Sequence, residues 1–212
     1  MLRRLKQLAR KTFLGPLVQG TRDRKVIRLW QEQGKPIPPP PAHKQCVVKH
    51  YAQKFQLKTL IETGTYQGEM ITAQEHVFAR IYSIELDPEL YWKANAKFAT
   101  SPHITVMQGA SSLKLPEILQ KSSGPCLFWL DAHYSGDITA RGSIDTPIIQ
   151  ELEIIFSRSN AKDIILIDDA RCFNGTSDYP TIEQLQQFIT SAKPTIKFVV
   201  ADDIIRVHEG KQ

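Results

Sequence analysis

Short apolar runs alternate with stretches of helical periodicity along most of this chain, and this alternation restricts the fold more than any other feature. Strands are predicted over residues 57–63, 80–85, 103–107, 126–130, 163–167, 196–201 and 204–208. Helices are predicted over residues 47–55, 69–79, 88–98, 116–121, 148–156 and 181–192. Strands that alternate with helices form a mainly parallel sheet that is covered by helices on both faces.

The last two predicted strands are separated only by Asp202-Asp203, which leaves no room for a crossover helix. They must therefore pair as an antiparallel hairpin. The predicted fold class is α/β: a Rossmann-like, doubly wound sheet of seven mostly parallel strands, with an antiparallel closing hairpin and helices on both faces.

The first 35 residues differ in charge from the rest of the chain. They contain ten Lys/Arg and two Asp/Glu, a balance of +8, whereas the other 177 residues contain 17 and 20. The body is therefore mildly acidic, and the basic pI gives no reason to expect nucleic-acid binding. Five prolines between residues 36 and 41 predict a stiff connector that is neither helix nor central strand. We expect a basic helical N-terminal arm with a Pro-rich linker (1–41) and one domain (42–212).

Residues 2–17 place leucines at three- and four-residue spacing and basic residues on the other face, which predicts a short amphipathic helix. This helix either lies on an anionic membrane surface or docks its apolar face on the domain or on a second subunit, which would make a homo-oligomer. A second short helix is predicted over 23–33, with Val26, Ile27 and Trp30 facing inward. No apolar run approaches the roughly 20 residues of a membrane span, and three widely spaced cysteines fit a reducing cytoplasm.

The first strand of the predicted domain ends in Glu62, and a turn that contains Gly64 and Gly68 leads into the next helix. In an open α/β sheet, ligands bind outside the carboxyl ends of the strands. Gly64 permits a tight turn and a close backbone approach. Glu85 ends the second strand about 20 residues beyond the glycines, where a carboxylate can accept hydrogen bonds from ribose hydroxyls. Together these residues predict a site for a nucleoside-type cofactor.

Carboxylates also end the fourth and fifth predicted strands, at Asp131 and at Asp168-Asp169. One interpretation is that they are helix caps and turn residues, for which Asp is favoured. However, these two strands are neighbours in this winding, and three carboxylates in one crevice would repel one another without a cation. Hard oxygen ligands suit Mg²⁺. We therefore predict a metal site at Asp131, Asp168 and Asp169.

His133 lies two residues beyond Asp131, where a neutral imidazole could take a proton from a bound hydroxyl; the alternative is an ordinary loop histidine. The connection from 133 to 146 is long and glycine-containing, as lids and binding loops often are. Tyr134 and Arg141 are therefore candidate substrate contacts, although Arg141 could equally be a surface charge.

On these residues, about 45–208 of the chain resembles class I S-adenosylmethionine-dependent methyltransferases. Residues 62–68 resemble the motif that cradles the methionine part of the cofactor, and Ser83-Ile84-Glu85 resembles the ribose motif. Residues 129–134 and 166–169 resemble the metal-dependent O-methyltransferases of sugar and macrolide tailoring, in which corresponding aspartates hold Mg²⁺. The whole pattern is most similar to a bacterial group of methyltransferase-like proteins. The resemblance implies cofactor contacts at Glu62, Thr63, Gly64, Tyr66, Gly68, Glu85, Gly109, Ser111 and Asp131.

The resemblance also implies catalytic roles for Asp131 and His133, the latter at the position of a general base that is commonly an aspartate. One departure concerns the third strand. Many such enzymes follow it with Gly-Asp-Ser, whose Asp contacts adenine, whereas this chain has Gly109-Ala110-Ser111. The replacement implies weaker cofactor binding, adenine held by backbone groups and Ser111, or loss of catalysis.

The leading hypothesis is an S-adenosylmethionine-dependent O-methyltransferase that acts, with Mg²⁺, on a hydroxyl of a sugar or other polyhydroxylated small molecule. The alternative is a non-catalytic binding module of the same fold that docks to a membrane or protein partner through its basic arm. A nicotinamide enzyme is disfavoured, because Gly64 and Gly68 do not complete the G-x-G-x-x-G fingerprint.

Overall fold

The computed structural model describes residues 15–131, 146–158 and 162–210, and it divides the chain into two compact units, residues 1–47 and 48–212. The division falls inside helix α3 (Pro41–Lys54) rather than at residue 42. Pro41 begins this helix, although the whole proline run was predicted to be non-helical. The first helical position tolerates proline because its missing N–H would have no intrahelical partner there.

The first unit contains helix α2 (Gly15–Glu32), which continues without the break that the sequence predicted before residue 23. Trp30 is buried as expected; its Nε1 donates a hydrogen bond to the carbonyl of Pro36 (2.8 Å), and its ring lies 4.4 Å from that of His43. Val26 was predicted to face inward but is 37% exposed. The predicted helix over 2–17 lies mostly outside the described residues. Among the described helices, none combines the length and the apolar character that crossing a membrane requires.

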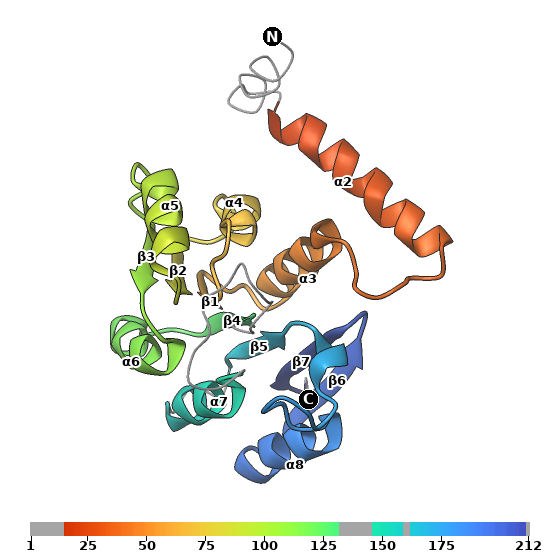
Figure 1. Cartoon of the computed structure of the whole chain (residues 1–212), viewed down its shortest axis with the longest axis vertical. Coiled ribbons are helices and arrows are strands. Elements are labelled where there is room, and N and C mark those ends of the chain that lie inside the picture. The colour runs from red at the N-terminus through yellow and green to blue at the C-terminus, as the bar shows by residue number, and fades with distance from the viewer. Residues whose placement is uncertain (1–14, 132–145, 159–161, 211–212) are drawn as a thin grey trace. The chain divides into compact units, whose positions relative to one another are not determined.

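The second unit is built on a seven-stranded sheet in the order β3-β2-β1-β4-β5-β7-β6 (Figure 1). The strands are β1 (Thr59–Thr63), β2 (Arg80–Glu85), β3 (Ile104–Gln108), β4 (Cys126–Leu130), β5 (Ile164–Ile167), β6 (Ile196–Ala201) and β7 (Ile204–Glu209). Strands β1 to β5 pair in parallel, and β7 runs antiparallel to both β5 and β6. The predicted doubly wound sheet with a closing hairpin is confirmed.

Helices cover both faces of this sheet (Figure 1). On one face lie α4 (Glu69–Gln74) and α5 (Pro88–Phe98); on the other lie α6 (Ser111–Lys121), α7 (Ile148–Ser157) and α8 (Ile182–Ala192). Strand β4 is buried along its whole length because it lies at the centre of the sheet. Its alternate residues Cys126, Phe128 and Leu130 join the core of the α6–α8 face, so that Leu127 and Trp129 point to the opposite face.

Two helix boundaries within the second unit also differ from prediction. Helix α4 ends at Gln74, not residue 79, because the N–H groups of Ala79 and Arg80 both bond to the carbonyl of Lys58 and start strand β2 (2.9 and 3.1 Å). Helix α6 begins at Ser111, and Pro116 lies inside it. Residues 116–121 were predicted to begin or lie in a short helix, and they form the second half of α6.

Candidate functional site

The turn after β1 has the tight geometry that its glycines predicted. The N–H groups of Gly64 and Thr65 both donate to the carbonyl of Ile84 (3.0 and 3.2 Å), which folds the chain back over the end of β2. Gly68 has a φ of +67°, and a Cβ at this position would lie 2.7 Å from the ring of Phe98. Only glycine therefore fits there without displacing a neighbour.

Glu85 closes this turn from the end of β2. Its two carboxylate oxygens accept hydrogen bonds from the backbone N–H groups of Tyr66 (2.7 Å) and Asp87 (2.9 Å). Burial raises the pKa of Glu85, and the two amide donors act in the opposite direction. The Tyr66 side chain itself is exposed, so its backbone N–H is the group tied to the site. The carboxylate is thus fixed at the strand edge where ribose hydroxyls were predicted to bind.

Glu62 lies beneath the same turn. Its carboxyl accepts a 2.5 Å hydrogen bond from Ser83, whose hydroxyl also lies 2.6 Å from that of Thr65. Burial raises the pKa of Glu62 to about 8, because the desolvation outweighs the Ser83 hydrogen bond and the charges of Asp131 and Glu85 add to it. Lys97 donates to the carbonyl of Gln67 (2.9 Å). These hydrogen bonds fix the position of the turn relative to β1 and β2.

The third strand ends at the same edge of the sheet. Gly109 has a φ of +137°, and its N–H donates to the carbonyl of Glu85 (2.9 Å). Ala110 precedes helix α6 and, having no polar side chain, offers no cap to it. Ser111 is buried at the first position of that helix. The predicted cofactor residues of β1, β2 and β3 therefore line one continuous edge.

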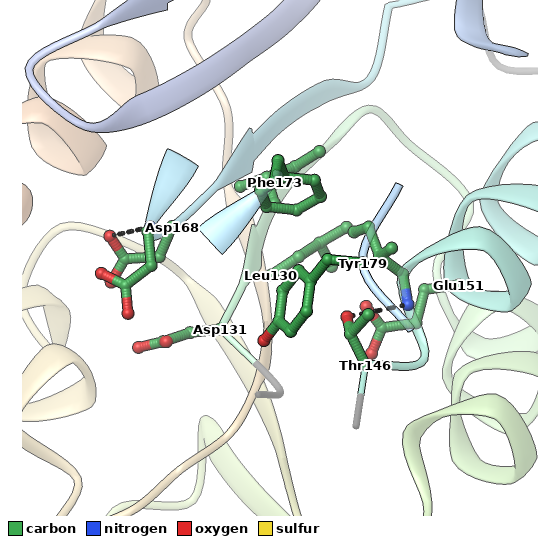
Figure 2. A pocket seen from close by; sticks show the side chains of 10 residues that line it. Leu130, Asp131, Thr146, Glu151, Asp168, Phe173 and Tyr179 are labelled. Atoms are coloured by element: carbon green, nitrogen blue, oxygen red, sulfur yellow. Dashed lines mark hydrogen bonds between the residues drawn. The ribbon is translucent and has the colours of Figure 1, made fainter. Parts of the chain in front are cut away.

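The structure brings the three predicted metal ligands together. One carboxylate oxygen from each of Asp131, Asp168 and Asp169 lies within 4.8 Å of the others. Strand pairing produces this proximity, because the Asp131 N–H bonds to the carbonyl of Thr63 and the Asp168 N–H to that of Leu130 (both 3.0 Å). The Asp169 N–H donates to Oδ1 of Asp168 (2.9 Å). In Figure 2 the side chains of Asp131 and Asp168 lie close together on one side of the pocket.

Arg171, which the sequence analysis did not identify, ties Asp169 to the closing hairpin. Its Nη1 lies 2.7 Å from Oδ1 of Asp169 and also contacts Oδ2 of Asp203, while its backbone N–H donates to Oδ1 of Asp203 (2.8 Å). Burial alone would lower the pKa of Arg171, but the hydrogen bonds and charges of the two aspartates raise it. Asp169 adopts a left-handed φ of +53°, which turns it out of the strand. The hairpin therefore helps to orient one of the candidate ligands.

A narrow pocket extends from the three aspartates toward helix α7. Beyond them it is lined by Leu130, Thr146, Ile148, Glu151, Ile167, Phe173 and Tyr179, and its volume of about 10 Å³ fits one water-sized group. In Figure 2 the Tyr179 ring lies between Asp131 and Thr146. Its ring packs edge-on against Phe173 (5.3 Å between centroids), and burial raises its pKa.

Glu151 is the second residue that the sequence analysis missed. It lies on α7, is 1% exposed, and faces Thr63 and Ser111. Burial raises its pKa to about 7, the nearby hydroxyls of Ser111 and Thr63 act in the opposite direction, and the charge of Asp131 raises it further. A signal was present in the sequence: Glu151 falls within the apolar stripe formed by Ile148, Leu152 and Ile155, where a carboxylate is not expected.

Three predicted site residues, His133, Tyr134 and Arg141, lie outside the described residues. The catalytic role of His133 and the substrate contacts of the other two therefore stay predictions.

Comparison with known proteins places the fold. No protein-family model and no curated protein matches the sequence. Among solved structures, the chain is similar to the O-methyltransferase TomG from Streptomyces achromogenes, in complex with S-adenosylmethionine (SAM) (14% identity, 87% of each chain, TM-score 0.58). It is also similar to an O-methyltransferase from Bacillus cereus in complex with S-adenosylhomocysteine (SAH) (14% identity, 97% of each chain, TM-score 0.58).

A third similar structure is a putative caffeoyl-CoA O-methyltransferase from Staphylococcus aureus (14% identity, 96% of this chain and 100% of that one, TM-score 0.59). The chain has the class I methyltransferase fold. At this level of identity the likeness concerns the fold, as the resemblance predicted, and the chemistry must be argued from the site.

Proposed function

We propose that this chain is a SAM-dependent O-methyltransferase that uses Mg²⁺ and acts on a hydroxyl of a sugar or other polyhydroxylated small molecule. The observation that carries the proposal is the meeting of Asp131, Asp168 and Asp169 beside the glycine turn of β1. This edge lies where the strand order reverses between β1 and β4, the place where open α/β sheets bind ligands.

The residues at this edge fit the proposed cofactor. Glu85 is held by two backbone amides, and each carboxylate oxygen retains a further lone pair for a ribose hydroxyl. The turn at Gly64 brings backbone close to the space above β1. The S. achromogenes and B. cereus structures contain SAM and SAH, respectively, on the same fold.

The cluster of Asp131, Asp168 and Asp169 fits a hard divalent cation. Its donors are carboxylate oxygens only, which is the ligand type that Mg²⁺ prefers. When bound, SAM supplies the methyl group and Mg²⁺ lowers the pKa of the acceptor hydroxyl.

The chain's own residues then have three tasks. Glu85 and the glycine turn position the methyl donor, and the aspartates orient the acceptor, so that the two reactants meet in line. Phe173 and Leu130 wall the pocket with apolar surface and limit the access of water. His133 is proposed to take the acceptor proton on its imidazole.

Calorimetric titration tests the proposal. The full chain is titrated with SAM and with SAH, each with and without Mg²⁺, and the acceptor class is then screened by transfer of a labelled methyl group to sugars and other polyols. Binding of either cofactor form supports the proposal, and failure to bind both would refute it. Cofactor binding without transfer to any acceptor would favour the non-catalytic module.

Substitutions then test the metal site. Asp131→Ala and Asp168→Ala should each abolish Mn²⁺ binding, which is followed by electron paramagnetic resonance. Asp168→Ala, which removes no predicted cofactor contact, should leave SAH binding largely unchanged. Glu117→Ala, which removes an exposed carboxylate from α6, is the matched control and should keep both. Retained Mn²⁺ binding in both aspartate variants would show that the metal binds elsewhere.

The N-terminal arm has two proposed roles, and deletion of residues 1–35 separates them. Loss of flotation with vesicles that contain anionic lipid would support contact with a membrane surface. A fall in the mass measured by light scattering would support subunit docking instead.

A further inference from the structure

Lys97, on helix α5, holds the end of the turn that follows β1. Its ammonium donates hydrogen bonds to the backbone carbonyls of Gln67 (2.9 Å) and Gly68 (3.2 Å). Burial lowers the pKa of Lys97, and the charges of nearby carboxylates act in the opposite direction. Lys97 is otherwise an exposed residue, so its ammonium could lie in water instead. Holding the ammonium on the backbone costs rotamer freedom, and the gain must lie in the turn.

This turn has a backbone that needs support. Tyr66 has a left-handed φ of +48° and Gly68 one of +67°, and this region is unfavourable for a residue with a side chain. The N–H of Tyr66 is held by the carboxylate of Glu85 (2.7 Å). Two side chains of opposite charge therefore hold the turn, because Glu85 accepts from an N–H and Lys97 donates to the carbonyls of the next two residues.

Helix α5 links these two contacts. Asp87, whose N–H donates to the other oxygen of Glu85 (2.9 Å), caps the start of the helix. At the end of the helix, a Cβ on Gly68 would lie 2.7 Å from the ring of Phe98 and 3.6 Å from Nζ of Lys97. The helix thus begins beside the predicted ribose carboxylate and ends against the turn.

The contacts of Lys97 indicate which part of the cofactor depends on it. The ribose is expected at Glu85, whereas residues 62–68 are predicted to receive the methionine part. Lys97 contacts only the turn in this region, at the two residues that follow the one held by Glu85. Its loss should therefore alter the binding of the methionine part and leave that of the nucleoside.

We propose that Lys97 is a positioning residue for the adenosyl cofactor: by holding the carbonyls of Gln67 and Gly68, it keeps the turn in the shape that receives the methionine part. The inference rests on the proposed function, since it requires that this edge binds SAM and SAH. Lys97 acts through the turn and does not itself contact the cofactor.

Three variants test this role by calorimetric titration with SAH. Lys97→Met keeps the aliphatic stem and removes the donor, so it should bind SAH roughly three- to tenfold more weakly, as expected for hydrogen bonds from a partly exposed charged group. Lys97→Arg keeps a charged donor and should retain most of the affinity. Lys93→Met is the control, because it removes an exposed lysine of the same helix, paired with Glu89, and should bind SAH as the unsubstituted chain does.

A second ligand separates positioning from a general structural role. Methylthioadenosine has the nucleoside and the sulfur of SAH but lacks its amino-acid part. Lys97→Met should bind methylthioadenosine as the unsubstituted chain does, so that only its affinity for SAH falls. A residue that merely supports the fold would lower the melting temperature and weaken both ligands alike.

The outcomes distinguish the inference from the proposed function. If the unsubstituted chain binds neither SAM nor SAH, the proposed function fails and the role of Lys97 fails with it. If the chain binds SAH and Lys97→Met binds it equally well, only the inference about Lys97 is refuted. Equal weakening of SAH and methylthioadenosine would also refute it, because the loss would not be confined to the methionine part.

Discussion

Replacing Arg171 by methionine should destabilise the domain, because two buried aspartates would lose the cation that lies beside them. The guanidinium lies against Asp169 and Asp203, whose side chains are 6% and 1% exposed. Methionine keeps much of the aliphatic length and removes the charge. Both carboxylates would then lose their shared cation, although Asp203 would keep the hydrogen bond from the backbone N–H of residue 171.

The size of the effect follows from this burial. Removing one partner of a buried ion pair costs about 3–5 kcal/mol, because the other charge stays buried. Arg171 itself is 35% exposed, so water screens part of its interaction. We therefore expect the free energy of unfolding to fall by roughly 2–3 kcal/mol, less than for a fully buried ion pair. For a domain of this size, that corresponds to a fall in Tm of about 5–10 °C.

Thermal unfolding followed by circular dichroism measures this loss, and a double-mutant cycle assigns it. Asp203→Asn and the Arg171→Met/Asp203→Asn double variant complete the cycle. The double variant should be less destabilised than the sum of the single ones, because it leaves only Asp169, and no longer Asp203, as a buried charge without the guanidinium. Lys93→Met is the control: its ion pair with Glu89 is exposed, so its removal should change stability by less than about 0.5 kcal/mol.

Two results would contradict the reasoning. One is an Arg171→Met variant that melts within about 1 °C of the unsubstituted chain, which would mean that solvent replaces the guanidinium without cost. The other is strict additivity in the cycle, which would mean that Arg171 and Asp203 stabilise the domain independently.

Three further predictions concern the cofactor edge. Gly68→Ala should lower the free energy of unfolding by about 1–2 kcal/mol because of its left-handed backbone alone. The new Cβ, 2.7 Å from the ring of Phe98, should lower it further, and urea unfolding measures the total. The pKa of Glu62 rises from 4.5 to about 8, so the native state holds a proton that the unfolded chain releases, and stability should fall as the pH rises through this window. Glu62→Gln should flatten that slope in melts from pH 5 to 9. Glu85→Gln should weaken SAH binding and cost about 1–3 kcal/mol, because its amide group must face a backbone N–H that Glu85 now accepts.

The fold could be predicted because the features that determine it lie in short segments of the sequence. Each strand is a short apolar run, and each connection is either long enough for a helix or, at Asp202-Asp203, too short for one. The errors arose where a tertiary contact decides a boundary. Helix α4 stops at Gln74 because strand β2 must start pairing at Arg80, and periodicity cannot show that competition.

The strand-end part of the site could be predicted for a related reason. Parallel strands carry their carboxyl ends to one edge, so residues that end different strands become neighbours whatever their separation in sequence. Asp131 and Asp168-Asp169 are brought together by this rule alone. Arg171 could not be found in this way, because its partner Asp203 comes from the turn of the antiparallel hairpin, on the far side of helix α8 in the sequence.

Glu151 shows how a buried carboxylate can be hidden in the periodicity of a helix. Its spacing from Ile148 and Ile155 is that of a core position, so a periodicity count treats it as one polar interruption in an apolar face. The physical cost of burying a carboxylate argues the other way: such a residue is unfavourable unless something accepts or shares its charge. The protein alone supplies only the hydroxyls near it, and Oε1 is left without a described partner. A core-spaced acidic residue on the helix next to a strand edge is therefore a reason to look for the ligand that completes its hydrogen bonding.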